Sequence, residues 1–219
     1  MRLTLYGDEM TDTTISMDSA IKRYETMKSS SKEKIEVYGE AAWIEVTTPQ
    51  KIDFWNNAKG TKFGERPATR LFYDLAHSCS IETGLITKSA FLNRRTKGGK
   101  YTKDHVYRPQ FICRFMLDNH EKFQHFDDFF PWWLMCCSTV IVTPKENDEL
   151  SIEGTDNRKG KFILKSRTDE QYSKMGLDLY SYSKESRWVN KTIEPVSNMI
   201  IVPQELQDYE KQVYGECAI

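Results

Sequence analysis

Apolar side chains recur at three- and four-residue intervals in several parts of this chain, which is the spacing of one face of an α-helix. The segment that follows Pro67 shows this spacing in Leu71, Phe72, Leu75, Ala76 and Cys79. Proline at the first position favours another helix over residues 109–119, because its fixed φ angle suits the first helical turn. We expect further helices over 18–27, 126–137 and 204–215.

Short runs rich in β-branched and aromatic residues predict strands elsewhere. Residues 35–48 contain Ile, Val and Trp and predict two strands joined near Gly39, whereas 28–34 and 56–67 have the composition of loops. Residues 139–142 predict a further short strand. Other strand-like runs cover 3–6, 160–166, 177–183 and 199–203.

The chain changes from strand to helix at Thr143. Threonine is a favourable N-cap, Pro144 suits the first helical position, and Thr143 with Glu146 fits the capping-box pattern. A strand followed directly by a helix is therefore predicted at this junction.

The length and composition indicate a folded protein of one domain, or of one domain with an elaboration. The 219 residues include 11 Phe, 5 Trp and 11 Tyr, too many aromatic rings for a solvated, disordered chain. No apolar run approaches the roughly 20 residues that span a bilayer, and residues 1–12 do not resemble a secretory signal. The five cysteines show no C-x-x-C spacing, which favours reduced, mostly buried thiols. We expect a cytoplasmic location and no membrane partner.

Positive charge is concentrated in one part of the chain. The formal net charge is −1, yet residues 88–114 contain eight basic residues and one acid, so this window carries +7 and the remainder −8. Such a stretch is either a solvated loop or an arm that follows phosphates. The candidate nucleic-acid-binding residues are Arg94, Arg95, Lys97, Lys100, Lys103 and Arg108.

Two short motifs, one within the basic stretch and one after it, are candidates for a catalytic site. The first is Lys103-Asp104-His105-Val106 beside the basic stretch, and the second is 142–147 at the strand–helix junction, ending in Glu146-Asn147. In this order they resemble the HNH, or ββα-metal, endonucleases of the phage homing kind, over about 50 residues from Tyr101 to Leu150. In that family a strand carries Asp-His and a later helix carries a final His or Asn.

The resemblance implies roles for four residues. His105 would be the general base that activates water, because histidine exchanges protons near neutral pH. Asp104 and Asn147 would provide oxygen ligands to one Mg²⁺ or Mn²⁺ ion, which stabilises charge on the phosphate. Asn119, the only asparagine between the motifs, would orient the histidine. Because Asn147 lies 42 positions after His105, two helices would be inserted between the strands of the site.

The leading hypothesis is a metal-dependent DNA endonuclease or nickase of the phage homing type, located in the cytoplasm of a bacterial host if the protein is phage-encoded. Its fold would be α+β, with a small ββα-metal core at 93–150, a helical insertion in that core, and α/β decorations at 1–92 and 151–219. The alternative is a non-enzymatic phage or host accessory protein that binds nucleic acid or a protein partner. In a third interpretation the basic stretch is an ordinary loop, His105 a surface histidine and Asn147 a first-turn helix residue.

Overall fold

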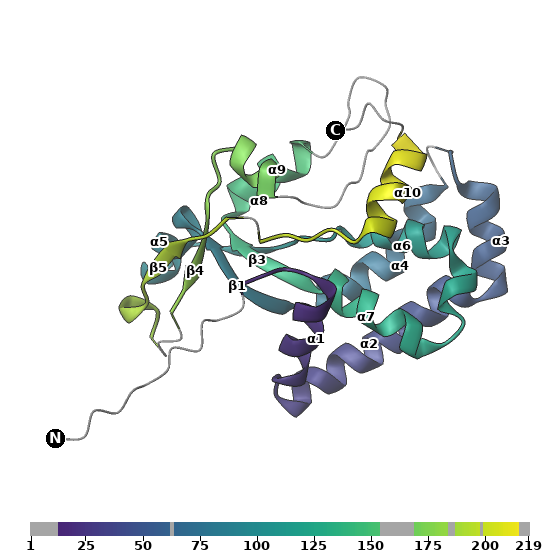
Figure 1. Ribbon diagram of the computed structural model, residues 1–219, viewed down its shortest axis with the longest axis horizontal. Helices are drawn as coiled ribbons and strands as arrows, with labels where there is room; N and C mark the ends of the chain where they lie inside the picture. The colour runs from purple at the N-terminus through teal and green to yellow at the C-terminus, as the bar shows by residue number, and fades with distance from the viewer. Residues whose placement is uncertain (1–12, 62–63, 154–168, 184–186, 198, 215–219) are drawn as a thin grey trace.

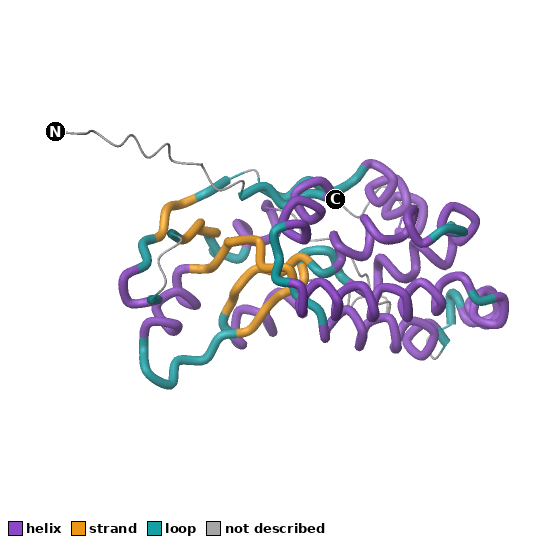
Figure 2. Tube along the Cα trace, turned by 90° about the horizontal axis from the view of Figure 1, so that it is seen from below, coloured by secondary structure: helices purple, strands orange, loops and turns teal. Residues whose placement is uncertain are grey.

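The computed structural model describes residues 13–61, 64–153, 169–183, 187–197 and 199–214. The protein has an α+β fold in which helices accompany one mixed five-stranded sheet, so the predicted α+β class is confirmed. The sheet lies at one end of the molecule and a group of helices at the other (Figures 1 and 2). The strands are β1 (Ile81–Thr87), β2 (Thr102–His105), β3 (Ser138–Val142), β4 (Leu179–Tyr182) and β5 (Ile193–Pro195).

The strand order is β2-β3-β1-β4-β5, in which β1 and β3 are parallel and every other neighbouring pair is antiparallel. The β1–β3 pairing is irregular between Glu82 and Ile86, where Gly84 adopts a φ of 81°. Glycine suits this position because a side chain would strain a backbone with positive φ. The predicted regions 1–92, 93–150 and 151–219 all contribute strands to this one sheet.

Different elements cover the two faces of the sheet. On one, Ile86 and Ile141 pack with Ala90 and Phe91 of α5 (Lys88–Arg95), and we call it the α5 face. On the other, α8 (Pro144–Glu153) and α9 (Asp169–Lys174) lie above the strands, and we call it the α8 face (Figure 1). Successive residues of a strand point to opposite faces, so the register assigns each side chain of β2 to one of them.

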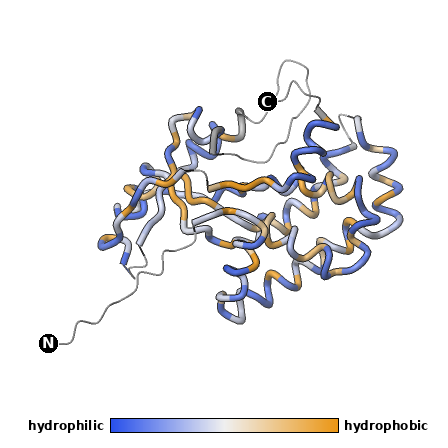
Figure 3. Tube along the Cα trace, viewed as in Figure 1, coloured by the Kyte–Doolittle hydropathy of each residue, from blue (hydrophilic) through white to orange (hydrophobic). Residues whose placement is uncertain are grey.

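The helical half contains most of the remaining helices and much of the apolar core. Hydrophobic segments run through the centre of the molecule, and hydrophilic residues predominate on the outer helices (Figure 3). Trp55, Phe72, Phe111 and Trp133 are among its largest fully buried side chains. Its elements are α1 (Met17–Glu25), α2 (Ser29–Thr47), α3 (Pro49–Ala58), α4 (Glu65–Ser78), α6 (Pro109–Asp118), η1 (His120–Phe123), α7 (Phe126–Cys136) and α10 (Gln204–Tyr214). The short 3₁₀ helix η3 (Trp188–Asn190) belongs to the sheet half.

The prediction of two strands over 35–48 after a loop at 28–34 is wrong, because α2 covers both segments. The buried residues of α2 are Ile35, Gly39, Ala42 and Val46, which follow helical spacing. Trp133 of α7 packs directly on Gly39 and its Nε1 donates a hydrogen bond to the Ile35 carbonyl at 2.9 Å. Packing of this face against α7 therefore outweighs the β-propensity of its Val and Ile residues.

Most other predicted elements are confirmed. Helices α4, α6, α7 and α10, strands β3 and β4, and the strand–helix junction at Thr143 all form as expected. The loop predicted over 56–67 is shorter, since α3 continues to Ala58 and α4 begins at Glu65. The strand-like run 199–203 forms only an isolated bridge through Ile200. The strands predicted over 3–6 and 160–166 lie outside the described residues.

Two further findings concern the cysteines and the possibility of a membrane-spanning helix. Cys79, Cys113, Cys136 and Cys137 are free and buried, which confirms the prediction of reduced thiols at these four positions, and Cys217 lies outside the described residues. Within the described ranges, no helix combines the length and the apolar composition that a membrane crossing requires.

Candidate nucleic-acid interface and the predicted metal site

Asp104 and His105, the two central residues of the predicted metal site, point to opposite faces of the sheet. Strand β2 pairs regularly with β3, with Asp104 opposite Val140 and His105 opposite Thr139. No bulge separates the two residues, so normal strand alternation holds. The Asp104 side chain lies on the α8 face and the His105 side chain on the α5 face.

His105 occupies a closed environment at the end of β2. Its Nε2 lies 3.1 Å from the Ala76 carbonyl oxygen and 3.4 Å from that of Cys79, so this nitrogen carries the proton and donates. The ring stacks on His77 with centroids 4.9 Å apart. Only 7% of the residue is exposed, and burial lowers the pKa of His105 to about 4. A neutral histidine held in this way joins β2 to the end of α4 and presents no nitrogen to solvent water.

Asp104 is equally enclosed on the opposite face. Its Oδ2 accepts a hydrogen bond of 2.7 Å from the Tyr172 hydroxyl of α9. Asn147 belongs to α8, which packs beside β2, and is half-buried on the turn between the buried Glu146 and Leu150. The structure therefore places Asp104 and the helix that carries Asn147 on one side of the sheet, away from His105.

Asn119 lies far from these residues. It caps the end of α6 and its Nδ2 donates to the Phe115 carbonyl at 2.9 Å. Helix α6 begins four residues after His105 and rises about 1.5 Å per residue, so Asn119 is about 15 Å along the helix from its start. It does not orient His105, because the protonated Nε2 of the imidazole is held by Ala76 and Cys79 instead.

The described residues do not fit the predicted Mg²⁺ or Mn²⁺ ion. Such hard cations require several oxygen ligands around one point. Asp104 is bonded to Tyr172, His105 faces the other way, and the described part of the chain has no group of three His, Cys, Asp or Glu side chains that could hold a metal. We therefore derive no catalytic step through a metal ion.

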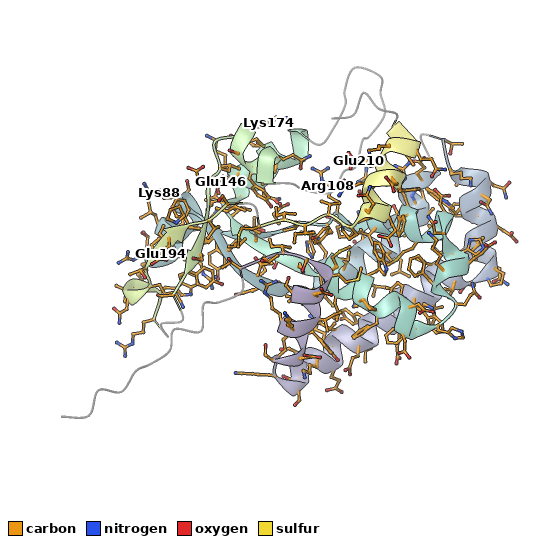
Figure 4. The ribbon with its side chains drawn as sticks, viewed as in Figure 1. Lys88, Arg108, Glu146, Lys174, Glu194 and Glu210 are labelled. Carbon is orange, nitrogen blue, oxygen red and sulfur yellow. The ribbon has the colours of Figure 1, made fainter. Side chains whose placement is uncertain are left out.

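The capping box at the start of α8 is confirmed and has a structural role. The Thr143 amide donates to the Glu146 carboxylate at 2.7 Å, and the Glu146 amide donates to the Thr143 hydroxyl at 3.2 Å. Thr87, at the end of β1, donates to the same carboxylate oxygen at 2.7 Å. Figure 4 shows Glu146 between α8 and the strands. The resemblance at Thr143 and Glu146 is thus explained by attachment of α8 to the sheet.

The basic stretch forms a surface together with a distant segment of the chain. Residues 88–103 form α5, a turn and the start of β2, and they meet the 187–193 segment around η3. The Arg95 Nη2 donates to the Val189 carbonyl at 2.7 Å, and the Arg94 guanidinium lies 3.8 Å from the Trp188 ring centroid. We call these two segments, 88–103 and 187–193, the basic surface. Figure 4 shows Lys88 at this end of the molecule.

Arg94 is the centre of an aromatic cluster on this surface. Its guanidinium lies 4.3 Å from the Tyr101 ring centroid and 3.8 Å from that of Trp188. Trp188 also contacts Tyr182 of β4, with ring centroids 5.0 Å apart, and the Lys191 ammonium lies 5.2 Å from the Trp188 centroid. Cation–π contacts of this kind hold both segments in a fixed arrangement.

Lys103 connects the basic surface to a hollow on the same face. Its ammonium lies 3.0 Å from the Glu82 carboxylate. Burial raises the pKa of Glu82, but Lys103, Arg94 and the Tyr182 hydroxyl together hold it below its usual range. The adjoining hollow has a volume of about 380 Å³ and is lined in part by Arg23, Glu82 and Lys103.

The predicted binding residues divide into two groups. Arg94, Arg95, Lys97, Lys100 and Lys103 all lie on the basic surface. Arg108 does not, because it follows the other end of β2, where its Nη2 donates to the Leu150 carbonyl of α8 at 2.9 Å. Sequence reasoning missed Arg187, Trp188 and Lys191, although an aromatic residue flanked by two cations was a visible local signal.

No protein-family model matches this chain, and comparisons with curated proteins and with solved structures also find no match.

Proposed function

We propose that this protein binds nucleic acid through the basic surface. The observation that supports the proposal is the meeting of two cationic segments that lie far apart in the sequence. Neither segment contains an Asp or Glu residue. Together they contribute eight cationic side chains, Lys88, Arg94, Arg95, Lys97, Lys100, Lys103, Arg187 and Lys191.

Internal neutralisation does not account for this charge. Among the described residues, Glu82 pairs with Lys103, whereas the exposed Lys97 and Lys100 have no ion-pair partner. A phosphate chain is the biological polymer whose regular negative charge would neutralise such a surface, and the release of its counterions would drive binding. Because the rest of the chain is acidic, contact would be confined to this end of the molecule.

Charge reversal at two exposed lysines of the basic surface tests the proposal. We expect Lys97→Glu/Lys100→Glu to weaken binding of a fluorescent oligonucleotide at least tenfold, measured by anisotropy at about 100 mM salt, because two phosphate contacts become repulsions. The control is Lys122→Glu/Lys211→Glu, an equal change of charge at exposed positions in the helical half. Equal binding by both variants and the wild type would refute the proposal.

Metal-dependent DNA cleavage is the second candidate function. One observation favours it: β2 and β3 are antiparallel and α8 follows β3 directly, the order of elements that the HNH resemblance implies for a ββα core with a helical insertion. The test is a plasmid assay with Mg²⁺ or Mn²⁺. The candidate requires nicking or linearisation by the wild type and loss of that activity in Asp104→Asn and His105→Ala. If the wild type cleaves no more than His105→Ala, the candidate fails.

A further inference from the structure

We infer that the basic surface binds single-stranded nucleic acid, with an unpaired base stacked on the partly exposed Tyr101 ring. This inference rests on the proposed function and adds the class of nucleic acid. It follows from the placement of apolar side chains among the cations.

Tyr101 is presented to solvent in a fixed position. The Arg94 guanidinium lies over the Tyr101 ring at 4.3 Å from its centroid, and over the Trp188 ring at 3.8 Å from its centroid. Even so, 43% of Tyr101 is exposed. The contact with Arg94 orders the ring before a ligand arrives, so stacking on its exposed part would cost little side-chain entropy.

Two further apolar side chains accompany Tyr101. Leu92 of α5 is 53% exposed and Val189 of η3 is 59% exposed, and Arg95 links α5 to η3 through the Val189 carbonyl. Exposed apolar groups therefore lie among the cations of the same surface. An ordinary phosphate-tracking surface needs only the cations.

Duplex and single-stranded ligands differ in what they offer these groups. A duplex presents phosphates and sugars on its outside and keeps the faces of its bases stacked inside, so the Tyr101 ring would remain in water. A single strand offers both phosphates and free base faces, and proteins that bind it combine cationic grooves with aromatic stacking side chains. The combination of Tyr101, Leu92 and Val189 with exposed lysines matches the single-stranded ligand.

The experiment compares binding to a labelled single DNA strand of about 20 nucleotides with binding to the duplex of the same sequence. This length exceeds the binding site of a typical single-strand-binding domain. We expect the wild type to bind the strand more tightly. Tyr101→Leu, which keeps an apolar side chain beside Arg94, should weaken strand binding about five- to hundredfold, the range for loss of one stacked base. Tyr101→Phe keeps the ring and should bind like the wild type.

The outcomes separate this inference from the proposed function. Duplex binding as tight as strand binding, with no effect of Tyr101→Leu, would overturn the inference and leave nucleic-acid binding intact. Absence of binding to either form would overturn both. Circular dichroism spectra and melting curves of Tyr101→Leu and Tyr101→Phe establish that the two variants are equally folded. Equal strand binding by these two variants would also contradict stacking on Tyr101.

Discussion

The stability of the fold should fall as the pH is lowered from neutrality, and His105 should account for a defined part of that loss. Its imidazole is buried against His77 and donates to the carbonyls of Ala76 and Cys79, and burial lowers its pKa to about 4. An unfolded histidine has a pKa of about 6.5. Protonation therefore favours the unfolded state, and the contribution of His105 is complete above pH 6.5 and is lost as the pH falls towards 4.

The two pKa values fix the size of the effect. At about pH 5 the unfolded imidazole is almost fully protonated while the native one is about nine-tenths neutral, which corresponds to a loss of about 2 kcal/mol relative to pH 7.5. Below pH 4 the loss approaches about 3 kcal/mol. His105→Gln keeps an N–H donor for the two carbonyls but does not titrate. The part of the stability loss at low pH that comes from His105 should therefore disappear in this variant.

Urea unfolding followed by circular dichroism gives the free energy of unfolding at pH 7.5 and at pH 5.0. The contribution of His105 is the change between these pH values in the wild type minus the same change in His105→Gln. The free energy of unfolding of the wild type should decrease by about 2 kcal/mol more than that of His105→Gln between pH 7.5 and 5.0. His125→Gln, which removes an exposed imidazole from the helical half, should behave as the wild type does. Identical pH dependence in wild type and His105→Gln would refute the account of His105 as a neutral structural residue.

Two further substitutions test the packing, each by denaturant unfolding. Gly39→Ala should destabilise the protein by about 1–2 kcal/mol despite the helix propensity of alanine, because the new Cβ would lie 3.0 Å from Trp133 Cδ1 and Nε1 in a filled core. The control is Glu40→Ala on the exposed side of α2. A Gly39→Ala protein more stable than the wild type would contradict this account of the packing. Tyr107→Phe should cost about 1–3 kcal/mol, since the buried hydroxyl lies 3.0 Å from the Ile15 carbonyl oxygen and 2.6 Å from that of Ile201. The exposed Tyr101→Phe should cost less than 0.5 kcal/mol, and equal costs at both tyrosines would be inconsistent with the role given to Tyr107.

The elements that the sequence predicts correctly are those in which local and tertiary signals agree. Pro109 begins α6, and Thr143 and Glu146 form the expected capping box before α8. The sequence mispredicts residues 35–48 because their Val and Ile residues favour strands locally, while Gly39 contacts Trp133, a residue 94 positions further along the chain. No local pattern reports such a contact.

The candidate site was predictable only in part. The charge of 88–103 is visible in the sequence, but its meeting with Trp188 depends on the pairing of β4 with β1. Alternation along β2 already favoured opposite faces for Asp104 and His105. The register with β3 decides this, because it shows that no bulge turns one of them back.

The salt dependence of single-strand binding tests the proposed function most directly. Each phosphate contact to a single strand contributes about 0.7 to the slope of log K against log salt concentration, so removing Lys97 and Lys100 should make the slope shallower by about 1.4. Anisotropy titrations between about 50 and 200 mM salt measure the slope for the wild type, Lys97→Ala/Lys100→Ala and the control Lys122→Ala/Lys211→Ala. The account predicts a shallower slope for the first variant alone. A slope of zero for the wild type, or the same slope for all three proteins, would contradict it.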